Sequence, residues 1–248
     1  MSPLLSVVIP AYNEAARLTA TLYAVRAFFQ NKPFACEVLV VDDGSSDATS
    51  ATVERGAASW PALRLLRNPG NRGKGYAVRH GMLEARGDLA LFSDADLSAP
   101  IEEADKLLEK LAEGFDVAIG SRALRRELIG RHQSPFREMA GQMVNLLVRA
   151  ATGLAFHDTQ CGFKLFRRAA AQAIFRRQRL EGFGFDVEVL YLARKLGFSA
   201  VEVPVRWNHA PGTKVRMVGD SVEMLTDLLR IRWWDLKGKY DSAQAPVV

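Results

Sequence analysis

Residues 37–47 read EVLVVDDGSSD, and this stretch decides the fold class. Its apolar residues follow one another without alternation, which is typical of a strand that is buried on both faces. The run ends in small and acidic residues that favour a turn. A helix is expected next, over about residues 47–59, with Ser45 or Ser46 as its N-cap. The stretch therefore predicts a strand, a turn and a helix, the unit from which parallel sheets are built.

The same alternation of strand and helix runs through the first half of the chain. Further apolar strands are expected at residues 6–9, 63–66 and 89–93. Further helices are expected at about residues 14–30 and 73–84, the first of which has apolar side chains at helical spacing. Apolar strands linked by helices predict an α/β fold with a mostly parallel central sheet, helices on both faces and right-handed crossovers.

The second half, from about residue 120, is less regular. Helices are expected near residues 139–153, 169–175, 184–196 and 220–234, and a strand at residues 200–205. Neither an internal repeat nor a linker rich in Pro, Gly or Ser divides the chain. We therefore expect a single domain over residues 1–248.

The composition excludes several classes of protein. With 48% hydrophobic and 25% charged residues, the chain is neither disordered nor collagen-like. It holds no apolar run of the roughly 18–20 residues that a membrane span needs, and residues 1–10 lack the basic start of a signal peptide. Cys36 and Cys161 match neither a metal motif nor a disulfide framework, so we expect a cytoplasmic protein.

The basic balance of the chain leaves three kinds of partner open. A net charge of +5 suits nucleic acid, an anionic membrane surface or a phosphorylated substrate. Signatures of RNA-binding domains are absent, and aromatic residues do not alternate with the arginines of residues 122–137 as a single-strand platform requires. We therefore expect no nucleic-acid partner, although the arginine run could also be an ordinary solvated face.

Polar clusters follow three of the expected strands directly, at residues 12–14, 42–47 and 94–96. Ligands of open α/β sheets bind outside the carboxyl ends of the strands. Asp94 and Asp96 can both face one hard cation, and Mg²⁺ or Mn²⁺ prefers such oxygen ligands together with substrate phosphate. The chain lacks the phosphate-binding glycine motifs of P-loop and Rossmann proteins. These clusters therefore predict a metal-assisted site for a nucleoside diphosphate, although acidic residues here could also merely cap helices.

Several motifs together resemble a known family. Residues 6–14 (SVVIPAYNE), 40–47 (VVDDGSSD), 71–75 (NRGKG) and 94–96 (DAD) are similar to the GT-A, family 2 inverting glycosyltransferases. Residues 158–166 (DTQCGFKLF), 185–188 (FDVE) and 212–214 (GTK) narrow the resemblance to dolichyl-phosphate β-glucosyltransferases and other polyprenyl-phosphate glycosyltransferases. The resemblance implies a Rossmann-like nucleotide-diphospho-sugar transferase fold. About residues 1–120 would bind the nucleotide sugar and the metal, and about residues 121–240 would bind the acceptor.

The resemblance also implies a role for each matching position. The nucleoside would be held by Pro10, Tyr12, Glu14 and Asp43, with Lys74 near the base or phosphates. Asp94 and Asp96 would engage the ribose, the diphosphate and Mg²⁺ or Mn²⁺. The acceptor phosphate would be received by Arg122, Arg131, Ser134 and Arg137. Asp186 falls where many members of the family have a catalytic base.

The implied reaction is metal-dependent transfer of a hexose, glucose from UDP-glucose, to a polyprenyl or dolichyl phosphate. A phosphate monoester has its second pKa near about 6, so this acceptor needs no base at pH 7. The alternatives are another donor, such as GDP-mannose or UDP-GlcNAc, and a hydroxyl acceptor that is not a lipid, for which Asp186 would be indispensable. A non-catalytic protein that binds nucleic acid or an anionic membrane is a further alternative.

Two amphipathic stretches bear on the membrane. Residues 139–153 and 220–234 combine apolar spacing with arginines, and the second adds Trp233 and Trp234. Basic residues and tryptophan favour a membrane interface, so these stretches would suit peripheral contact with the inner face of a membrane. A core helix with a basic outer face would show the same pattern.

Overall fold

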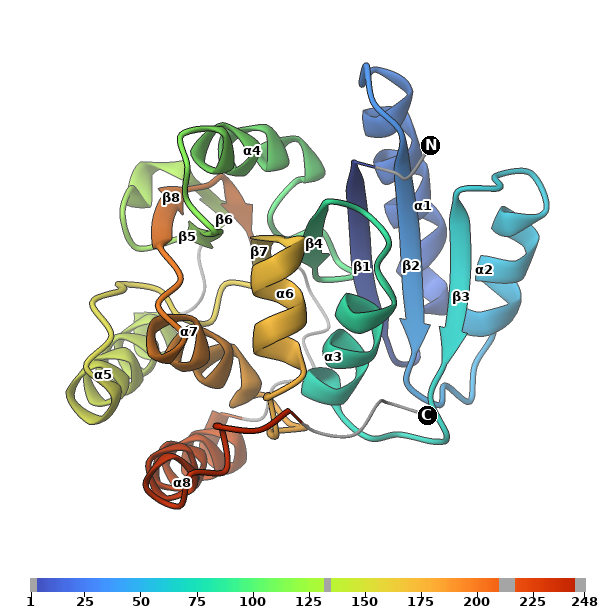
Figure 1. Cartoon of the computed structure of the whole chain (residues 1–248). Coiled ribbons are helices and arrows are strands. Elements are labelled where there is room, and N and C mark those ends of the chain that lie inside the picture. The colour runs from blue at the N-terminus through green and yellow to red at the C-terminus, as the bar shows by residue number, and fades with distance from the viewer. Residues whose placement is uncertain (1–3, 132–134, 210–216, 244–248) are drawn as a thin grey trace.

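A seven-stranded sheet forms the centre of the structure (Figure 1), a computed structural model that describes residues 4–131, 135–209 and 217–243. The strand order is β3-β2-β1-β4-β7-β5-β8. The strands are β1 (Leu5–Ala11), β2 (Cys36–Asp42), β3 (Leu63–Arg67), β4 (Leu89–Ser93), β5 (Val117–Ser121), β7 (Phe163–Arg167) and β8 (Ala200–Pro204). A separate two-stranded sheet pairs β6 (Ile129–Arg131) with β9 (Trp207–Asn208).

One strand of the large sheet runs against the others. β7 pairs antiparallel with both β4 and β5, whereas the β1–β2, β1–β4, β2–β3 and β5–β8 pairs are parallel. The expected α/β fold with a mostly parallel sheet is thus confirmed. β5 and β7 were not expected as strands, because β5 is short and contains Gly120, and Lys164 interrupts the apolar run of β7. Six strands therefore share one direction, and their carboxyl ends lie at one edge.

Helices cover both faces of the sheet, as the sequence predicts. The helices are α1 (Ala15–Gln30), α2 (Thr49–Ala57), α3 (Lys74–Glu84), α4 (Ala104–Ala112), α5 (Pro135–Thr152), α6 (Arg168–Phe175), α7 (Phe185–Lys195) and α8 (Met217–Leu236), with 3₁₀ turns at Ile101–Glu103 and Arg126–Leu128. Figure 1 shows α3 and α6 in front of the sheet and α1 behind it. Val8 packs with the core beneath α3, α6 and α7, whereas its neighbour Val7 packs with the core beneath α1 and α4. Alternate side chains of one buried strand thus supply two separate cores.

Neither Ser45 nor Ser46 caps α2, contrary to the expectation. The helix begins at Thr49, with Ala48 as the N-cap residue and no side-chain cap bond. The Ser45 hydroxyl instead accepts the backbone N–H of Asn13 at 2.8 Å, and the Asn13 side chain accepts the N–H of Ser46 at 2.8 Å. The two serines therefore join the turn after β2 to the turn after β1, a contact between segments far apart in the sequence.

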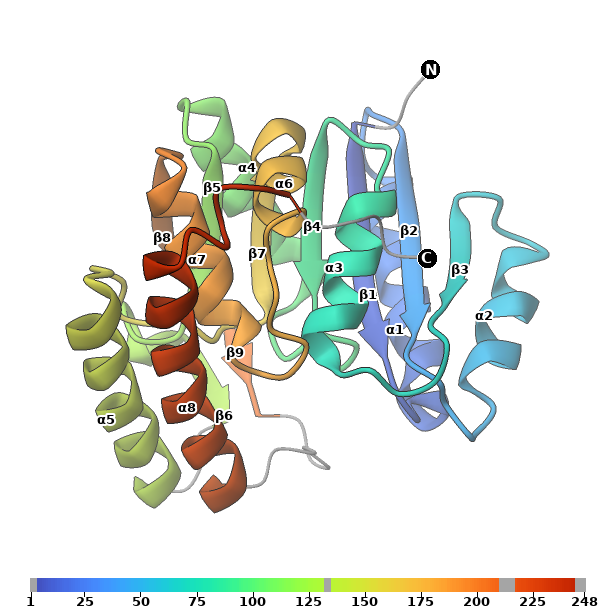
Figure 2. The same ribbon diagram turned by 60° about the horizontal axis from the view of Figure 1, so that its bottom comes forward.

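Helices α5 and α8 run side by side at one end of the molecule (Figure 2). Each turns part of its apolar surface outward. The exposed residues are Met143, Leu146 and Leu147 on α5 and Leu225, Leu229, Trp233 and Leu236 on α8. Among the described residues no helix is both long and apolar enough to cross a membrane.

Candidate active site

The predicted polar clusters meet at the carboxyl edge of the sheet. Tyr12 follows β1, Asp43 follows β2, Asp94 follows β4 and Arg122 follows β5 directly in the chain. Pro10 is the penultimate residue of β1 and is partly exposed, and Tyr12 is 37% exposed. A nucleotide could therefore reach this edge from solvent.

Asp43 organises the loop that follows β3. Its buried carboxylate accepts the backbone N–H groups of Arg72 at 3.1 Å and Gly73 at 2.7 Å, and the side-chain amide of Asn68 at 2.7 Å. Gly44, next to it, has a φ of 73°, and a Cβ there would lie 2.5 Å from the carbonyl carbon of Gly70. The turn after β2 (residues 42–47) and the loop at residues 70–73, here called the glycine-rich loop, thus pack backbone against backbone. Asp43 has protein partners on both oxygens.

Lys74 is the first residue of α3 and joins that helix to the end of β4. Its ammonium lies 2.7 Å from Oδ1 of Asp94. Burial lowers the pKa of Lys74, but the carboxylates of Asp94 and Asp186 outweigh it, and the pKa lies above its usual range. The lysine therefore carries its charge at the centre of the site.

Glu14 and Asp96 share a second cation. Arg17 lies 2.8 Å from a carboxylate oxygen of Glu14 and 3.9 Å from one of Asp96. Asp96 also accepts the backbone N–H of Ser98 at 2.9 Å. The structure thus places Glu14 and Asp96 around one arginine.

The donor set at this edge fits a divalent cation only in part. Within the described ranges no three Asp, Glu, His or Cys side chains converge into a metal cluster. Asp94 and Asp96 offer two hard oxygen ligands, and Mg²⁺ is commonly held by one or two carboxylates plus water and substrate phosphate. The pair therefore suits a cation that arrives with a diphosphate.

Asp186, the candidate base, is buried below this edge. Its side chain is in the first turn of α7, only 3% of the residue is exposed, and it forms an ion pair with the buried Lys164 of β7. Burial raises the pKa of Asp186, and the ammonium groups of Lys164 and Lys74 oppose that rise. Lys164 also donates to the carbonyl of Cys161 at 2.7 Å. Lys164 was not expected as a site residue. The sequence signal that could have found it is a single lysine between apolar residues.

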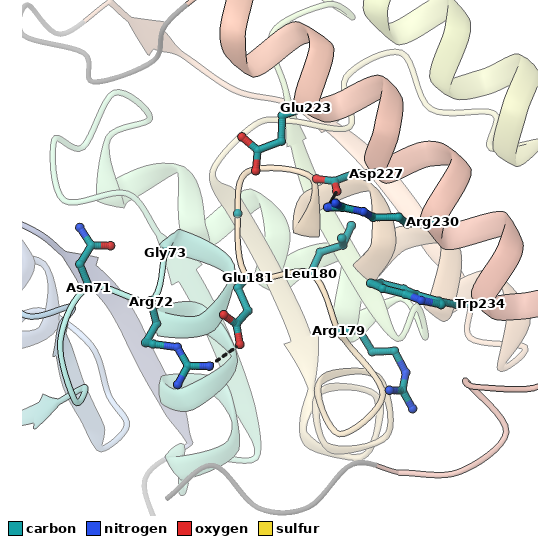
Figure 3. A pocket seen from close by; sticks show the side chains of 11 residues that line it. Asn71, Arg72, Gly73, Arg179, Leu180, Glu181, Glu223, Asp227, Arg230 and Trp234 are labelled. Atoms are coloured by element: carbon teal, nitrogen blue, oxygen red, sulfur yellow. Dashed lines mark hydrogen bonds and ion pairs between the residues drawn. The ribbon is translucent and has the colours of Figure 1, made fainter.

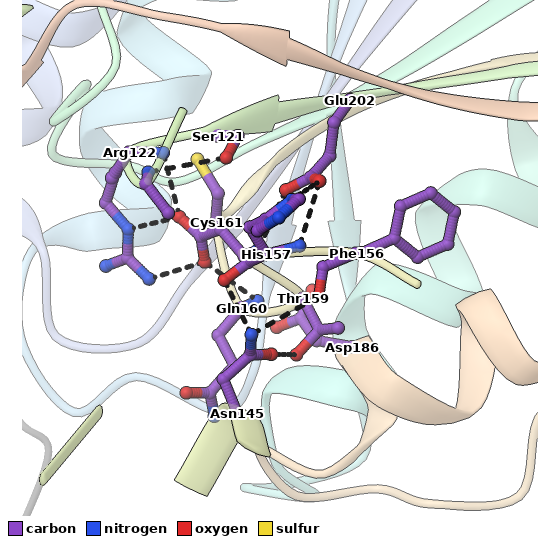
Figure 4. Close-up of polar contacts among 12 residues, drawn as sticks. Ser121, Arg122, Asn145, Phe156, His157, Thr159, Gln160, Cys161, Asp186 and Glu202 are labelled. Atoms are coloured by element: carbon purple, nitrogen blue, oxygen red, sulfur yellow. Dashed lines mark hydrogen bonds and ion pairs between the residues drawn. The ribbon is translucent and has the colours of Figure 1, made fainter. Parts of the chain in front are cut away.

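Arg122 is held rigidly by a residue to which the sequence assigned no separate role. Its Nε and Nη2 donate to the two oxygens of Asp158 at 2.7 and 2.8 Å, and its backbone N–H donates at 2.9 Å. Asp158 in turn donates its backbone N–H to Glu202 at 2.8 Å. Figure 4 shows Arg122 and the His157–Glu202 pair in this polar network. Burial opposes the charge of both partners, yet their attraction lowers the pKa of Asp158 and raises that of Arg122.

The fork with Asp158 leaves Arg122 with N–H groups for a ligand. Its half-buried guanidinium also lies 5.4 Å from the centre of the Trp207 ring. The other expected phosphate ligands cannot be placed: Ser134 and the side chains of Arg131 and Arg137 lie outside the described residues, as do residues 212–214.

A cavity of about 470 Å³ lies beside the glycine-rich loop (Figure 3). It is bounded by residues 71–73, the loop at residues 179–182 and helix α8. Arg72 and Glu181 both line it and form an ion pair at 2.7 Å. The carbonyl of Glu181 also accepts the backbone N–H of Gly75 at 2.7 Å. This cavity therefore shares its wall with the first turn of α3, which carries Lys74.

Solved structures with the same architecture include glycosyl-3-phosphoglycerate synthases. Mannosyl-3-phosphoglycerate synthase from Rubrobacter xylanophilus superposes with a TM-score of 0.67 at 20% identity, over 99% of this chain and 78% of that one. Glucosyl-3-phosphoglycerate synthase from Mycobacterium tuberculosis, solved with Mn²⁺, UDP and its product, gives 0.65 at 18% identity, over 92% and 80%. These matches confirm the GT-A fold.

Sequence similarity goes further than the fold. The family described as Glycosyl transferase family 2 matches residues 6–175. A dolichyl-phosphate β-glucosyltransferase from Drosophila melanogaster is 41% identical over 92% of this chain and 74% of its own length. The proteins of that name from Saccharomyces cerevisiae and Homo sapiens are 36% and 35% identical, over 95% and 97% of this chain and 76% and 78% of their own lengths. The chain belongs to glycosyl transferase family 2, among the relatives of the dolichyl-phosphate β-glucosyltransferases.

Proposed function

We propose that the protein transfers glucose from UDP-glucose to a dolichyl or other polyprenyl phosphate, with inversion at the anomeric carbon. The observation that carries this proposal is the similarity to dolichyl-phosphate β-glucosyltransferases over more than nine-tenths of the chain. The edge that presents Lys74 and Arg122 supports it, because a diphosphate donor and a phosphate acceptor both need cationic partners.

The reaction needs two reactants held in line. An oxygen of the acceptor phosphate forms the new bond to the anomeric carbon of the sugar, and the bond from that carbon to the diphosphate breaks. The transition state has oxocarbenium character, as glycosyl transfers generally do. Lys74 would face the departing diphosphate, and the remaining N–H groups of Arg122 would orient the acceptor.

A divalent cation fits this scheme as a partner of the donor. Asp94 and Asp96 would hold Mg²⁺ or Mn²⁺, which neutralises charge on the diphosphate when bound. This assignment is supported by the two carboxylates at the carboxyl edge and by the presence of Mn²⁺ with UDP in the structural relative from M. tuberculosis.

Asp186 has a positioning role in this scheme. A phosphate acceptor is largely a dianion at pH 7, so no proton has to be removed. The buried Asp186 instead sets the electrostatic environment of Lys74 and Lys164. A hydroxyl acceptor would need a base with access to substrate, which the 3% exposure of Asp186 disfavours.

The acceptor lipid places the reaction at a membrane surface. The exposed apolar residues of α5 and α8 would contact the bilayer, with the exposed Arg149, Arg230 and Arg232 near anionic headgroups. Cys36 and Cys161 are both free, which supports a cytoplasmic location at the inner face of the membrane.

The direct test is product formation. Purified protein is incubated with radiolabelled UDP-glucose, Mg²⁺ or Mn²⁺ and a short polyprenyl phosphate, and the sugar extracted into organic solvent is counted. We expect extractable glucose that depends on the metal, and none when the unphosphorylated polyprenol replaces the acceptor. Transfer from GDP-mannose or UDP-GlcNAc but not from UDP-glucose would show that the donor is another sugar nucleotide. Transfer to the unphosphorylated polyprenol would overturn the proposal that the acceptor is a phosphate.

A further inference from the structure

Four side chains of alternating charge form a row from the buried sheet to the site. The row comprises Lys164 on β7, Asp186 on α7, Lys74 on α3 and Asp94 after β4. Lys164 pairs with Asp186, and Lys74 lies 2.7 Å from Asp94. Asp186 also attracts Lys74. Lys74 therefore contacts Asp94 at the edge and is also attracted by the buried Asp186.

Several contacts restrict where the ammonium of Lys74 can go. The backbone N–H groups of Gly75 and Tyr76 donate to the carbonyl of Glu181, which fixes the start of α3. The ammonium lies 5.2 Å from the centre of the Phe92 ring. These contacts fix the backbone from which the Lys74 side chain extends, so its ammonium stays near Asp94.

In this position the ammonium of Lys74 would repel a divalent cation bound to Asp94. Asp94 has an ammonium in hydrogen-bond contact at Oδ1, and Asp94 is one of the two carboxylates proposed to hold the divalent cation. Two cations this close repel each other, and the repulsion is strong where the surroundings are partly dry. A diphosphate bound between the ammonium and the divalent cation would offset this repulsion, because its negative charge attracts both.

We propose that Lys74 is the internal counter-cation of Asp94, which excludes the divalent cation from the free enzyme and turns to the diphosphate when donor and cation enter together. The inference rests on the proposed nucleotide donor and metal, and it adds an order to their binding: the cation binds well only when the nucleotide is present.

The test measures binding without turnover. Mn²⁺ is titrated into the full-length protein, and free Mn²⁺ is followed by its electron paramagnetic resonance signal, with and without UDP. For the natural protein we expect weak Mn²⁺ binding that tightens when UDP is added. For Lys74→Met we expect Mn²⁺ binding without UDP about tenfold tighter than in the natural protein, and a smaller effect of UDP.

Three further variants make the result specific. Lys74→Arg keeps the charge and should bind Mn²⁺ as weakly as the natural protein without UDP. Lys32→Met removes an equal charge from the remote pair with Asp105, and should leave Mn²⁺ binding unchanged. Lys74→Gln replaces Lys74→Met if the latter does not fold.

Two outcomes would decide against the inference. Folded Lys74→Met that binds Mn²⁺ no tighter than the natural protein without UDP would overturn it. An equal gain in Lys32→Met would show that only net charge matters. If the natural protein binds Mn²⁺ with UDP in either case, the proposed donor and metal stand although the role of Lys74 does not.

Discussion

Arg122 and Asp158 show how a buried ion pair can prepare a residue for a ligand. Three hydrogen bonds join them, and the carboxylate is almost entirely buried. Asp158→Ala would leave the guanidinium without its partner, which we expect to lower the free energy of unfolding by about 3 kcal/mol. The KM for polyprenyl phosphate should rise more than the KM for UDP-glucose, because Arg122 would lose its orientation. Urea denaturation and steady-state kinetics measure the two effects.

An exposed ion pair provides the control for that experiment. Glu54 and Arg67 lie 2.6 Å apart, but more than half of each side chain is exposed. Glu54→Ala should therefore change the free energy of unfolding by less than about 1 kcal/mol. If Asp158→Ala were as mild as this variant, the pair with Arg122 would not be the structural support that its geometry indicates.

Glu188 predicts how stability depends on pH. Its carboxylate is fully buried in α7 and accepts hydrogen bonds from the backbone of Arg179 and Leu180 and from the Tyr240 hydroxyl. Burial raises its pKa to about 7, although these bonds oppose the rise. The folded state thus binds the proton more tightly than the unfolded state. The stabilisation is complete below pH 4.5 and is lost as pH rises to about 7.

Replacing Glu188 by Gln should remove this dependence. The free energy of unfolding of the natural protein should contain a term that falls by up to about 3 kcal/mol between pH 4.5 and 7.5. The same urea titrations on Glu188→Gln should lack that term, so the difference between the two proteins should change with pH. A difference that stays constant over this range would show that Glu188 does not titrate there.

At the residue level, position after a strand was the informative signal. Asp43 and Asp94 were expected directly after strands, whereas Arg122 was named only by the family resemblance, because β5 was not expected. All three lie at the carboxyl edge. Asn68 follows β3 at the same edge and binds Asp43, so the same rule would have found it. Asp158 comes from a loop whose approach to Arg122 depends on tertiary packing, which periodicity does not encode.

At the scale of the elements, α5 and α8 carry exposed apolar side chains that do not pack against the sheet. Leu146 and Leu229 are 64% and 73% exposed, one on each helix. A charge at either position would oppose insertion into a bilayer. We expect Leu146→Glu with Leu229→Glu to weaken binding to anionic vesicles at least tenfold in a flotation assay. Activity on a detergent-solubilised short acceptor should persist, because neither leucine lies among the site residues.

Tyr23 supplies the matched control for membrane contact. It is 77% exposed on α1, far from α5 and α8 in the fold. Tyr23→Glu should float with vesicles as the natural protein does. Equal loss of binding in both variants would mean that added negative charge, rather than the α5 and α8 surface, controls the association.

Secondary structure was predictable where the apolar residues followed a single pattern, either a continuous run or helical spacing. The strands and helices of the first ninety residues follow apolar runs and helical spacing, and they agree with the structure within a few residues. β7 escaped prediction because Lys164 interrupts its apolar run, and the ion pair with Asp186 that makes this burial tolerable is a tertiary contact. The antiparallel direction of β7 has no signal in local sequence at all.

At the scale of the whole molecule, the C-terminal segment around Tyr240 supports the carboxyl edge of the sheet where the donor is proposed to bind, here called the donor edge. Tyr240 is fully buried and donates to Glu188, which also binds the backbone of residues 179–180. The next residue, Glu181, accepts the backbone N–H groups at the start of α3. The C-terminal segment is thus connected through two loops to the helix that presents Lys74.

Tyr240→Phe tests whether this connection affects donor binding. The change removes one hydroxyl and leaves the carboxylate of Glu188 with one donor fewer, which should cost about 1–2 kcal/mol of unfolding free energy. Because Lys74 is held through the same chain of contacts, the Kd for UDP with Mn²⁺ should also rise severalfold in calorimetry. Tyr23→Phe removes a hydroxyl from an exposed tyrosine and should change neither quantity. A loss of stability without any change in UDP binding would show that the C-terminal segment supports the fold but not the donor edge.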